Sequence, residues 1–140
     1  MSKIIISTDK LKLDIPYIHS FLSTSYWAKG RTIEQVETSI EHSICFGVYL
    51  ADRQIGFARV LTDYVVFAYL MDVFIDPVYR GKGYAKLLLQ QILQHPDFEA
   101  LNQWHLKTKD AHSFYEQLGF QAIENKEWWM VLKNKGICNK

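Results

Sequence analysis

Three β-rich runs that follow one another almost without interruption constrain this fold more than any other feature of the sequence. They span residues 44–50, 54–61 and 65–75, and short polar turns such as 51–53 separate them. A parallel connection needs a crossover of about a dozen residues or more, which these turns cannot supply. The three runs are therefore predicted to form an antiparallel meander.

The spacing of apolar residues changes to a helical one after Gly83. A helix that ends before Pro96 is predicted from apolar residues three or four apart, namely Ala85, Leu88, Leu89 and Ile92. Residues 104–106 then form a short predicted strand. Because a helix connects this strand to the run 65–75, the two can pair in parallel as a βαβ unit.

The segment before the meander carries a strand signal and two helix signals. Residues 4–6 are three isoleucines and predict a first strand. Asp14 is placed to cap a helix, and Thr32 followed by Gln35 has the spacing of a capping box that opens a second one.

After residue 106 we expect one more helix and two more strands. The helix is predicted over residues 110–118, with Asp110 as N-cap and Gly119 placed to end it. Residues 120–123 and 128–132 are predicted to complete the sheet. The resulting fold class is α/β with a mixed, mostly antiparallel sheet and helices on both faces, in a single domain over residues 1–140.

Composition narrows the function classes. Sixteen Lys plus Arg against fifteen Asp plus Glu leave a formal charge of +1, without the basic stripe that nucleic-acid binding needs. Cys45 and Cys138 are too few for a disulfide scaffold, and neither they nor the five histidines have the spacing of metal ligands. The apolar run 65–71 is too short to span a bilayer. We expect a cytoplasmic protein with no metal, no membrane and no nucleic-acid partner.

The loop 76–85 lies between the end of a strand and the start of a helix. Free backbone N–H groups and the helix dipole favour an anionic phosphate there, and Gly81 and Gly83 let the backbone approach it closely. Arg80 and Lys82 add positive charge. On the loop alone, a plain turn with exposed cations remains an alternative. A dinucleotide fingerprint is excluded by Lys86, and a P-loop by the glycine that follows Lys82.

Two motifs resemble those of one enzyme family. Arg80-x-x-Gly83-x-Ala85 resembles the Arg/Gln-x-x-Gly-x-Gly/Ala motif of the GNAT superfamily of N-acetyltransferases, and residues 114–120, Phe-Tyr-Glu-Gln-Leu-Gly-Phe, resemble its second motif. Residues 73–77, which precede the first motif, and the order of the predicted helices and strands are also similar to those of this family. The resemblance covers nearly the whole chain.

The resemblance implies that acetyl-CoA binds where the central strand and the next strand splay apart. Backbone groups of Val73 and Ile75, on either side of Phe74, would bond the pantetheine arm. The pyrophosphate would be held by Arg80 and by amides of Gly81, Lys82, Gly83, Tyr84 and Ala85. Phe114 would lie near the cofactor, and Thr108 stands where the family often has Asn.

Two residues are candidates for catalysis. Tyr115 matches the tyrosine that many GNAT enzymes use as general acid, and a phenol with a pKa of about 10 can protonate a thiolate whose acid has a pKa of about 8.5. Asp72 interrupts an apolar strand, and we hypothesise that it orients the amine or accepts its proton. The alternatives are that Tyr115 only packs and that Asp72 is a structural carboxylate.

The acceptor is predicted to be a primary amine of a small molecule or peptide, attacked directly in a ternary complex by a monomer or homodimer. Candidate acceptor-binding residues are Tyr26, Trp27, Arg31, Asp63, Tyr64 and Trp128, although aromatic residues at such spacing often belong to a core. A non-catalytic acyl-CoA sensor and a phosphate-binding domain unrelated to CoA are the alternative functions.

Overall fold

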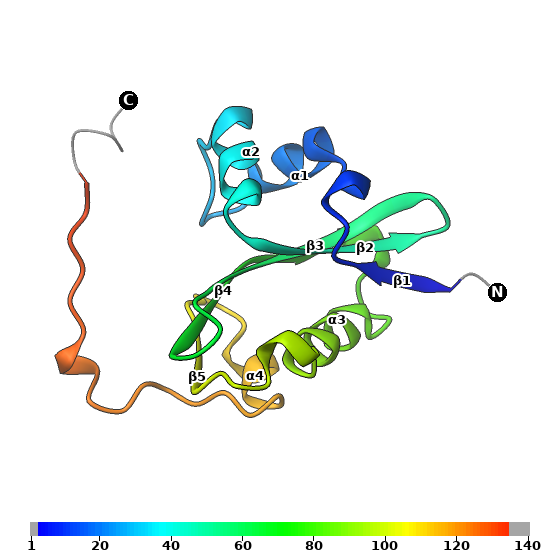
Figure 1. Ribbon diagram of the computed structural model, residues 1–140. Helices are drawn as coiled ribbons and strands as arrows, with labels where there is room; N and C mark the ends of the chain where they lie inside the picture. Colours follow the sequence, from blue (N-terminus) through cyan, green and yellow to red (C-terminus); the bar gives the residue numbers. More distant parts are fainter. Residues whose placement is uncertain (1–2, 135–140) are drawn as a thin grey trace. The chain divides into compact units, whose positions relative to one another are not determined.

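In the part of the chain that the structure describes, the sheet has five strands, and they lie side by side in the order in which they occur in the chain (Figure 1). The structure is a computed structural model that describes residues 3–134. The strands are β1 (Ile4–Ser7), β2 (Ile44–Leu50), β3 (Arg53–Thr62), β4 (Phe67–Ile75) and β5 (Gln103–Leu106). Neighbours pair antiparallel from β1 to β4, and β4 pairs with β5 in parallel. The predicted meander and the parallel βαβ unit are confirmed.

β4 pairs with its two neighbours over different lengths. Against β3 the pairing continues as far as Ile75, which lies opposite Gly56. Against β5 it stops at Leu70, which lies opposite Leu106. Among residues 3–134, the last five residues of β4, from 71 to 75, therefore have no strand on their β5 side.

Helices cover both faces of this sheet. α1 (Ile15–Leu22) and α2 (Ile33–Glu41) lie on one face and α3 (Tyr84–Leu93) lies on the other (Figure 1). The predicted caps are confirmed, since Asp14 accepts from the Tyr17 amide and Thr32 forms a complete capping box with Gln35. Short 3-10 turns occupy residues 10–12, 77–79 and 96–98.

The core between the sheet and α1 and α2 fixes the direction of β4. Phe74 is buried and stacks on Phe21 of α1, with ring centroids 3.9 Å apart. Phe57 of β3 packs against the Phe74 ring from another direction, with ring centroids 6.1 Å apart. Truncating a buried phenylalanine to alanine typically costs about 3–5 kcal/mol. The Phe74 side chain thus belongs to the core.

The described residues fall into two compact units, one ending at Lys107 and one beginning at Thr108. The second unit contains α4 (His112–Glu116) and a 3-10 turn, η4 (Lys126–Trp128). The single domain stays a prediction. Cys138 lies outside the described residues. Within residues 3–134, no helix combines the length and apolar character needed to cross a membrane.

Four sequence predictions for the second unit are wrong. The N-cap of α4 is Ala111 rather than Asp110, and the helix ends at Glu116 instead of 118. Among the described residues no strand follows β5, so the strands predicted at 120–123 and 128–132 are absent. Aromatic and β-branched residues favour a strand only where a partner strand supplies the ladder. Here the left-handed backbone of Asn125 and the η4 turn interrupt the segment.

Two tyrosines of the first unit, the buried Tyr49 and the half-buried Tyr17, make opposite use of their hydroxyl groups. The Tyr49 hydroxyl is buried without a hydrogen-bond partner, whereas the Tyr17 hydroxyl donates to Asp76 Oδ2 at 3.0 Å. Burial raises the pKa of Tyr49 from an ordinary value of 10.0 to about 12. Burial first, and then the bond to Asp76, raise the pKa of Tyr17 as well.

We expect Tyr49→Phe to raise the free energy of unfolding by about 1 kcal/mol, because it removes an unpaired buried hydroxyl. The unfolded chain loses the Tyr49 proton at a lower pH than the folded one, so this group's contribution to stability falls as pH rises from about 10 to about 12. Tyr49→Phe should remove that loss. Urea unfolding at pH 7 and at pH 9 to 11 measures both effects.

Tyr17→Phe is the matched variant and should lower the free energy of unfolding by about 1–2 kcal/mol, because it removes a hydrogen bond to Asp76. Equal effects of the two variants would contradict the assignment.

Candidate functional site

The unpaired end of β4 presents backbone groups toward the side where β5 has stopped. The amide of Asp76 donates to Ile55 O of β3 at 2.7 Å. Since backbone direction alternates along a strand, Phe74 also faces β3, while Val73 and Ile75 face the open side. The N–H groups of Val73 and Ile75 can therefore bond an extended ligand lying along β4.

Arg80 and Asp76 fix the start of the loop that follows β4. Arg80 Nε donates to Ile75 O at 3.1 Å, which turns the Arg80 side chain back over the strand end. Asp76 caps the turn 77–79 by accepting from the Val78 amide at 3.0 Å, and its second oxygen accepts from Tyr17 of α1. The loop is thereby tied both to its own strand and to α1.

Two glycines shape the passage from this loop into α3. Gly81 and Gly83 have φ angles of +79° and +83°, a left-handed region that favours glycine. Gly83 is the N-cap of α3 and supplies no side-chain cap, and the first helical bond runs from the Leu87 amide to Gly83 O. The amides of the first turn therefore have no acceptor within the helix, and the helix dipole adds positive potential. This end of α3 is suited to an anion.

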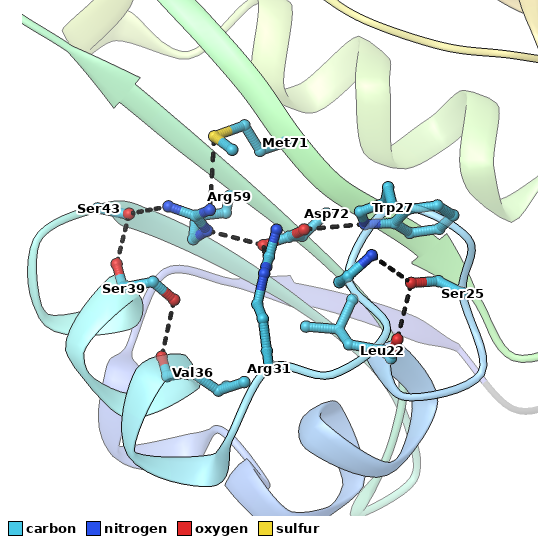
Figure 2. Close-up of polar contacts among 11 residues, drawn as sticks. Leu22, Ser25, Trp27, Arg31, Val36, Ser39, Ser43, Arg59, Met71 and Asp72 are labelled. Atoms are coloured by element: carbon cyan, nitrogen blue, oxygen red, sulfur yellow. Dashed lines mark hydrogen bonds and ion pairs between the residues drawn. The ribbon is translucent and has the colours of Figure 1, made fainter. Parts of the chain in front are cut away.

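Asp72 is the centre of a buried polar cluster on the α1 and α2 side of β4 (Figure 2). Its Oδ1 accepts from Trp27 Nε1 at 2.9 Å. Its Oδ2 accepts from Arg31 Nη1 at 2.8 Å and from Arg59 Nε at 2.9 Å. The Asp72 side chain is only 1% exposed. Both carboxylate oxygens are thus occupied by protein donors.

The backbone of Asp72 is as unusual as its side chain. Its φ is +54°, a left-handed conformation within a strand, at the place where the β3–β4 register shifts between Phe57 and Arg59. Such a conformation costs a residue with a side chain on the order of 1–3 kcal/mol. The hydrogen bonds to Trp27 and the two arginines offset this cost and hold the bulge in place.

Arg59 is a site residue that sequence reasoning missed. It is buried in β3, and besides Asp72 its guanidinium donates to Ser43 Oγ at 3.0 Å and to Met71 Sδ at 3.4 Å. Arg59 is the only charged residue in the apolar run 54–61, which indicates a buried cation, and a buried cation needs a buried anion as its partner. Asp72, one strand further along the chain, is that anion.

The structure brings some predicted acceptor-binding residues together and not others. Trp27 and Arg31 meet at Asp72, and Tyr26 packs edge-on against Trp27 with ring centroids 5.2 Å apart. Tyr26 and Trp27 are both exposed, at 52% and 40%.

Asp63 and Tyr64 lie elsewhere, in the turn between β3 and β4. Asp63 Oδ1 accepts from the amides of Val65 and Val66, and these bonds hold the pKa of Asp63 below its usual value. The turn precedes Phe67 at the start of β4, roughly 20 Å along the strand from Val73. Neither residue is brought to the Asp72 cluster.

The remaining predicted residues belong to the unit that begins at Thr108. The Thr108 hydroxyl accepts from the Ala111 amide at 3.1 Å and so helps to start α4. Phe114 and Tyr115 pack edge-on at 5.0 Å, and the Tyr115 ring packs against Phe120 at 5.7 Å. Trp128 is exposed.

The described residues hold no metal site that competes with β4, and the hollow that they form lies away from it. Within residues 3–134, no group of three or more His, Cys, Asp or Glu side chains could hold a metal ion. An open hollow of about 440 Å³ lies on α2, lined by Glu34, Gln35, Thr38, Ser39 and His42. None of these lining residues belongs to β4 or to the loop before α3.

We expect Asp72→Asn to lower the free energy of unfolding by about 3 kcal/mol or more, because Arg59 would stay buried without a counter-charge. Urea unfolding at pH 7 measures the loss. Asp63→Asn is the control, since it makes the same chemical change at an exposed turn and should have a much smaller effect. If Asp72→Asn were as stable as the native chain, the cluster would not hold the β4 bulge.

Comparison with known proteins extends the description of the site. Residues 41–122 match the family model of the GNAT acetyltransferase domain. A relative from Gibberella zeae, named as an inferred acetyltransferase, is 31% identical over 144 residues, which cover 84% of this chain and 78% of the relative.

Solved structures agree with these sequence matches. An inferred acetyltransferase of the GNAT family from Xanthomonas campestris pv. campestris has a TM-score of 0.93 and 40% identity, covering 100% of this chain and 99% of that one. An acetyltransferase from Clostridium acetobutylicum, assigned by inference and crystallised with acetyl-CoA, has a TM-score of 0.69 over 97% of this chain and 98% of its own. At 14% identity, that second likeness shows the fold alone.

Proposed function

Because the chain belongs to the GNAT acetyltransferase family, we propose that it transfers the acetyl group of acetyl-CoA to a primary amine of a small molecule or peptide, by direct attack in a ternary complex. One observation carries the proposal. The open side of β4 presents backbone donors that lead directly into an uncapped helix N-terminus. An extended arm with a diphosphate at its end fits that sequence of donors.

The diphosphate end would be held mainly by the backbone. The left-handed glycines expose successive amides from Gly81 to Ala85, and no acidic residue occupies the first turn of α3. Lys82 supplies positive charge beside them. Arg80 contributes its charge from a fixed position, because its Nε already bonds Ile75 O.

The pantetheine arm would lie along Val73 and Ile75. A free Val73 amide beside the thioester carbonyl would stabilise the oxyanion that forms when the amine attacks. Because donor and acceptor are both bound, attack becomes effectively intramolecular, which supplies much of the rate.

Two protons must move in this reaction. The neutral amine nitrogen bonds to the carbonyl carbon and loses one proton to solvent water. The carbon–sulfur bond breaks, and the departing thiolate takes a second proton from a general acid. We assign that acid to Tyr115, whose phenol is protonated at neutral pH. The support for this assignment is the match of residues 114–120 to the family's second motif.

Asp72 is assigned a positioning role rather than that of a proton acceptor. Its two oxygens already accept three hydrogen bonds, two of them from arginines. The alternative of a general base would require one of these donors to withdraw. Asp72 instead places Arg31 and Trp27 beside the β4 segment that would bind the thioester.

Acetyl-CoA binding is the first test. We expect calorimetry to show binding of acetyl-CoA and CoA that is tighter than binding of ADP, and ligand at a hundred times its dissociation constant should stabilise the fold by about 2.7 kcal/mol. Gly83→Asp should weaken the affinity for acetyl-CoA at least tenfold, because it places a negative charge at the N-terminus of α3.

Gly30→Asp is the matched control for that variant. Gly30 also has a left-handed φ, +94°, with nothing within 4 Å of an added Cβ, so it carries the same backbone strain away from α3. Its affinity for acetyl-CoA should stay within twofold of the native chain. If the native chain binds acetyl-CoA no better than ADP, the proposal fails.

The second test concerns Tyr115. We expect Tyr115→Phe to lower kcat by about a hundredfold, since a positioned general acid contributes factors of this order, and to leave the affinity for acetyl-CoA nearly unchanged. Thiol release in the presence of an amine measures turnover. An unchanged kcat would remove Tyr115 from the mechanism. Tight acetyl-CoA binding without thiol release for any amine would favour the acyl-CoA sensor.

A further inference from the structure

The two arginines that pair with Asp72 differ in how many of their donors are used. The Arg59 side chain is 6% exposed, and all three of its guanidinium nitrogens donate to neighbouring side chains. The Arg31 side chain is 25% exposed, and only its Nη1 has an acceptor among residues 3–134. Nε and Nη2 of Arg31 form one planar edge of the guanidinium, and that edge is left for another acceptor.

The cluster also carries an excess of positive charge. One carboxylate stands against two guanidinium groups, so the ion pairs leave one positive charge uncompensated. Glu34, the acid closest to Arg31 in the sequence, forms no ion pair with it in the described part of the chain. The Arg59 guanidinium is buried and also bonds Ser43 and Met71, so its charge lies inside the protein. The excess charge is therefore accessible at Arg31.

The free edge of Arg31 lies close to the proposed reaction centre. Asp72, to which Arg31 is bonded at 2.8 Å, directly precedes Val73 on β4. Trp27 bonds the other oxygen of the same carboxylate, and its exposed indole lies in the same loop between α1 and α2 (Figure 2). A cation and an aromatic surface thus flank the place where an acceptor would approach the thioester.

We propose that Arg31 binds an anionic group of the acceptor, so that the preferred substrate is a primary amine that also carries a carboxylate or a phosphate. A guanidinium edge matches either oxyanion with two parallel hydrogen bonds. Asp72 fixes the orientation of this edge by holding Nη1. The inference rests on the proposed acetyltransferase function and makes Arg31 a residue that determines acceptor specificity.

Matched pairs of amines test the proposal. Acetyl transfer is compared between β-alanine and β-alaninamide, between 4-aminobutyrate and its amide, and between phosphoethanolamine and ethanolamine. The native chain should prefer the anionic member of at least one pair by tenfold or more in kcat/KM, and the pair affected tells carboxylate from phosphate. Arg31→Gln should reduce that preference to within about twofold of unity, mainly through KM. Arg31→Lys, which keeps the charge and loses the planar edge, should fall between them.

Lys29→Gln is the control for charge alone, because Lys29 lies in the same loop, carries the same charge and, in the described part of the chain, forms neither a hydrogen bond nor an ion pair with Asp72. It should retain the preference of the native chain. Melting curves of every variant separate loss of fold from loss of discrimination, since an unfolded fraction lowers the rate for both members of a pair equally.

Three results would overturn the proposal. They are equal kcat/KM for anionic and neutral amines in the native chain, an unchanged preference in Arg31→Gln, and an equal loss of preference in Lys29→Gln. If the native chain acetylates anionic and neutral amines equally and efficiently, the proposed acetyltransferase function stands and only the role of Arg31 is overturned. If none of these amines is acetylated, thermal shift of the CoA-loaded protein with acetate, glycine and inorganic phosphate decides. Absence of an Arg31-dependent stabilisation then overturns the proposal, while absence of CoA binding overturns the proposed function.

Discussion

The carboxylate of Asp72 joins three parts of the first unit that are distant in the sequence. It binds Arg59 of β3, and Trp27 and Arg31 of the loop between α1 and α2, while its own backbone forms the bulge in β4. A bulge inserts one residue into a strand and so decides which of the following residues turn toward each neighbour. The outward direction of Val73 and Ile75 therefore depends on this one side chain, whereas the side they face is open because pairing with β5 ends at Leu70.

The site separates two kinds of recognition. The proposed acetyl-CoA site uses backbone amides of β4 and of the first turn of α3. Its main requirement on residue type is for two glycines that can adopt left-handed φ angles. The acceptor side uses side chains from the loop between α1 and α2, where Trp27 and Arg31 lie. Loop positions other than Trp27 and Arg31 can change without loss of the hydrogen bonds that hold the β4 bulge. A family can therefore keep one donor while its members differ in acceptor.

Elements governed by local chemistry could be predicted from the sequence. The short turns of the meander, the capping box at Thr32 and the glycines before α3 each involve residues close together in the chain. The partners of Asp72 could not be predicted in this way, because they lie 13 to 45 residues away in the sequence. Strand propensity over 128–132 misled the prediction because the sequence does not say whether a partner strand is present. Asp63 is predicted to add polarity to the acceptor site, whereas its carboxylate accepts hydrogen bonds from backbone amides of its own turn.

Arg31 has two roles, and this limits how the acceptor specificity of such a protein can change in evolution. The residue that would choose the acceptor also neutralises a buried acid, so a lineage that abandons one acceptor for another cannot exchange Arg31 freely. A neutral replacement becomes tolerable only after Arg59 alone has become sufficient for Asp72, or after Asp72 itself has changed. New acceptor preferences should therefore arise first at Tyr26 and at other positions around the cluster, with the buried charges inherited together.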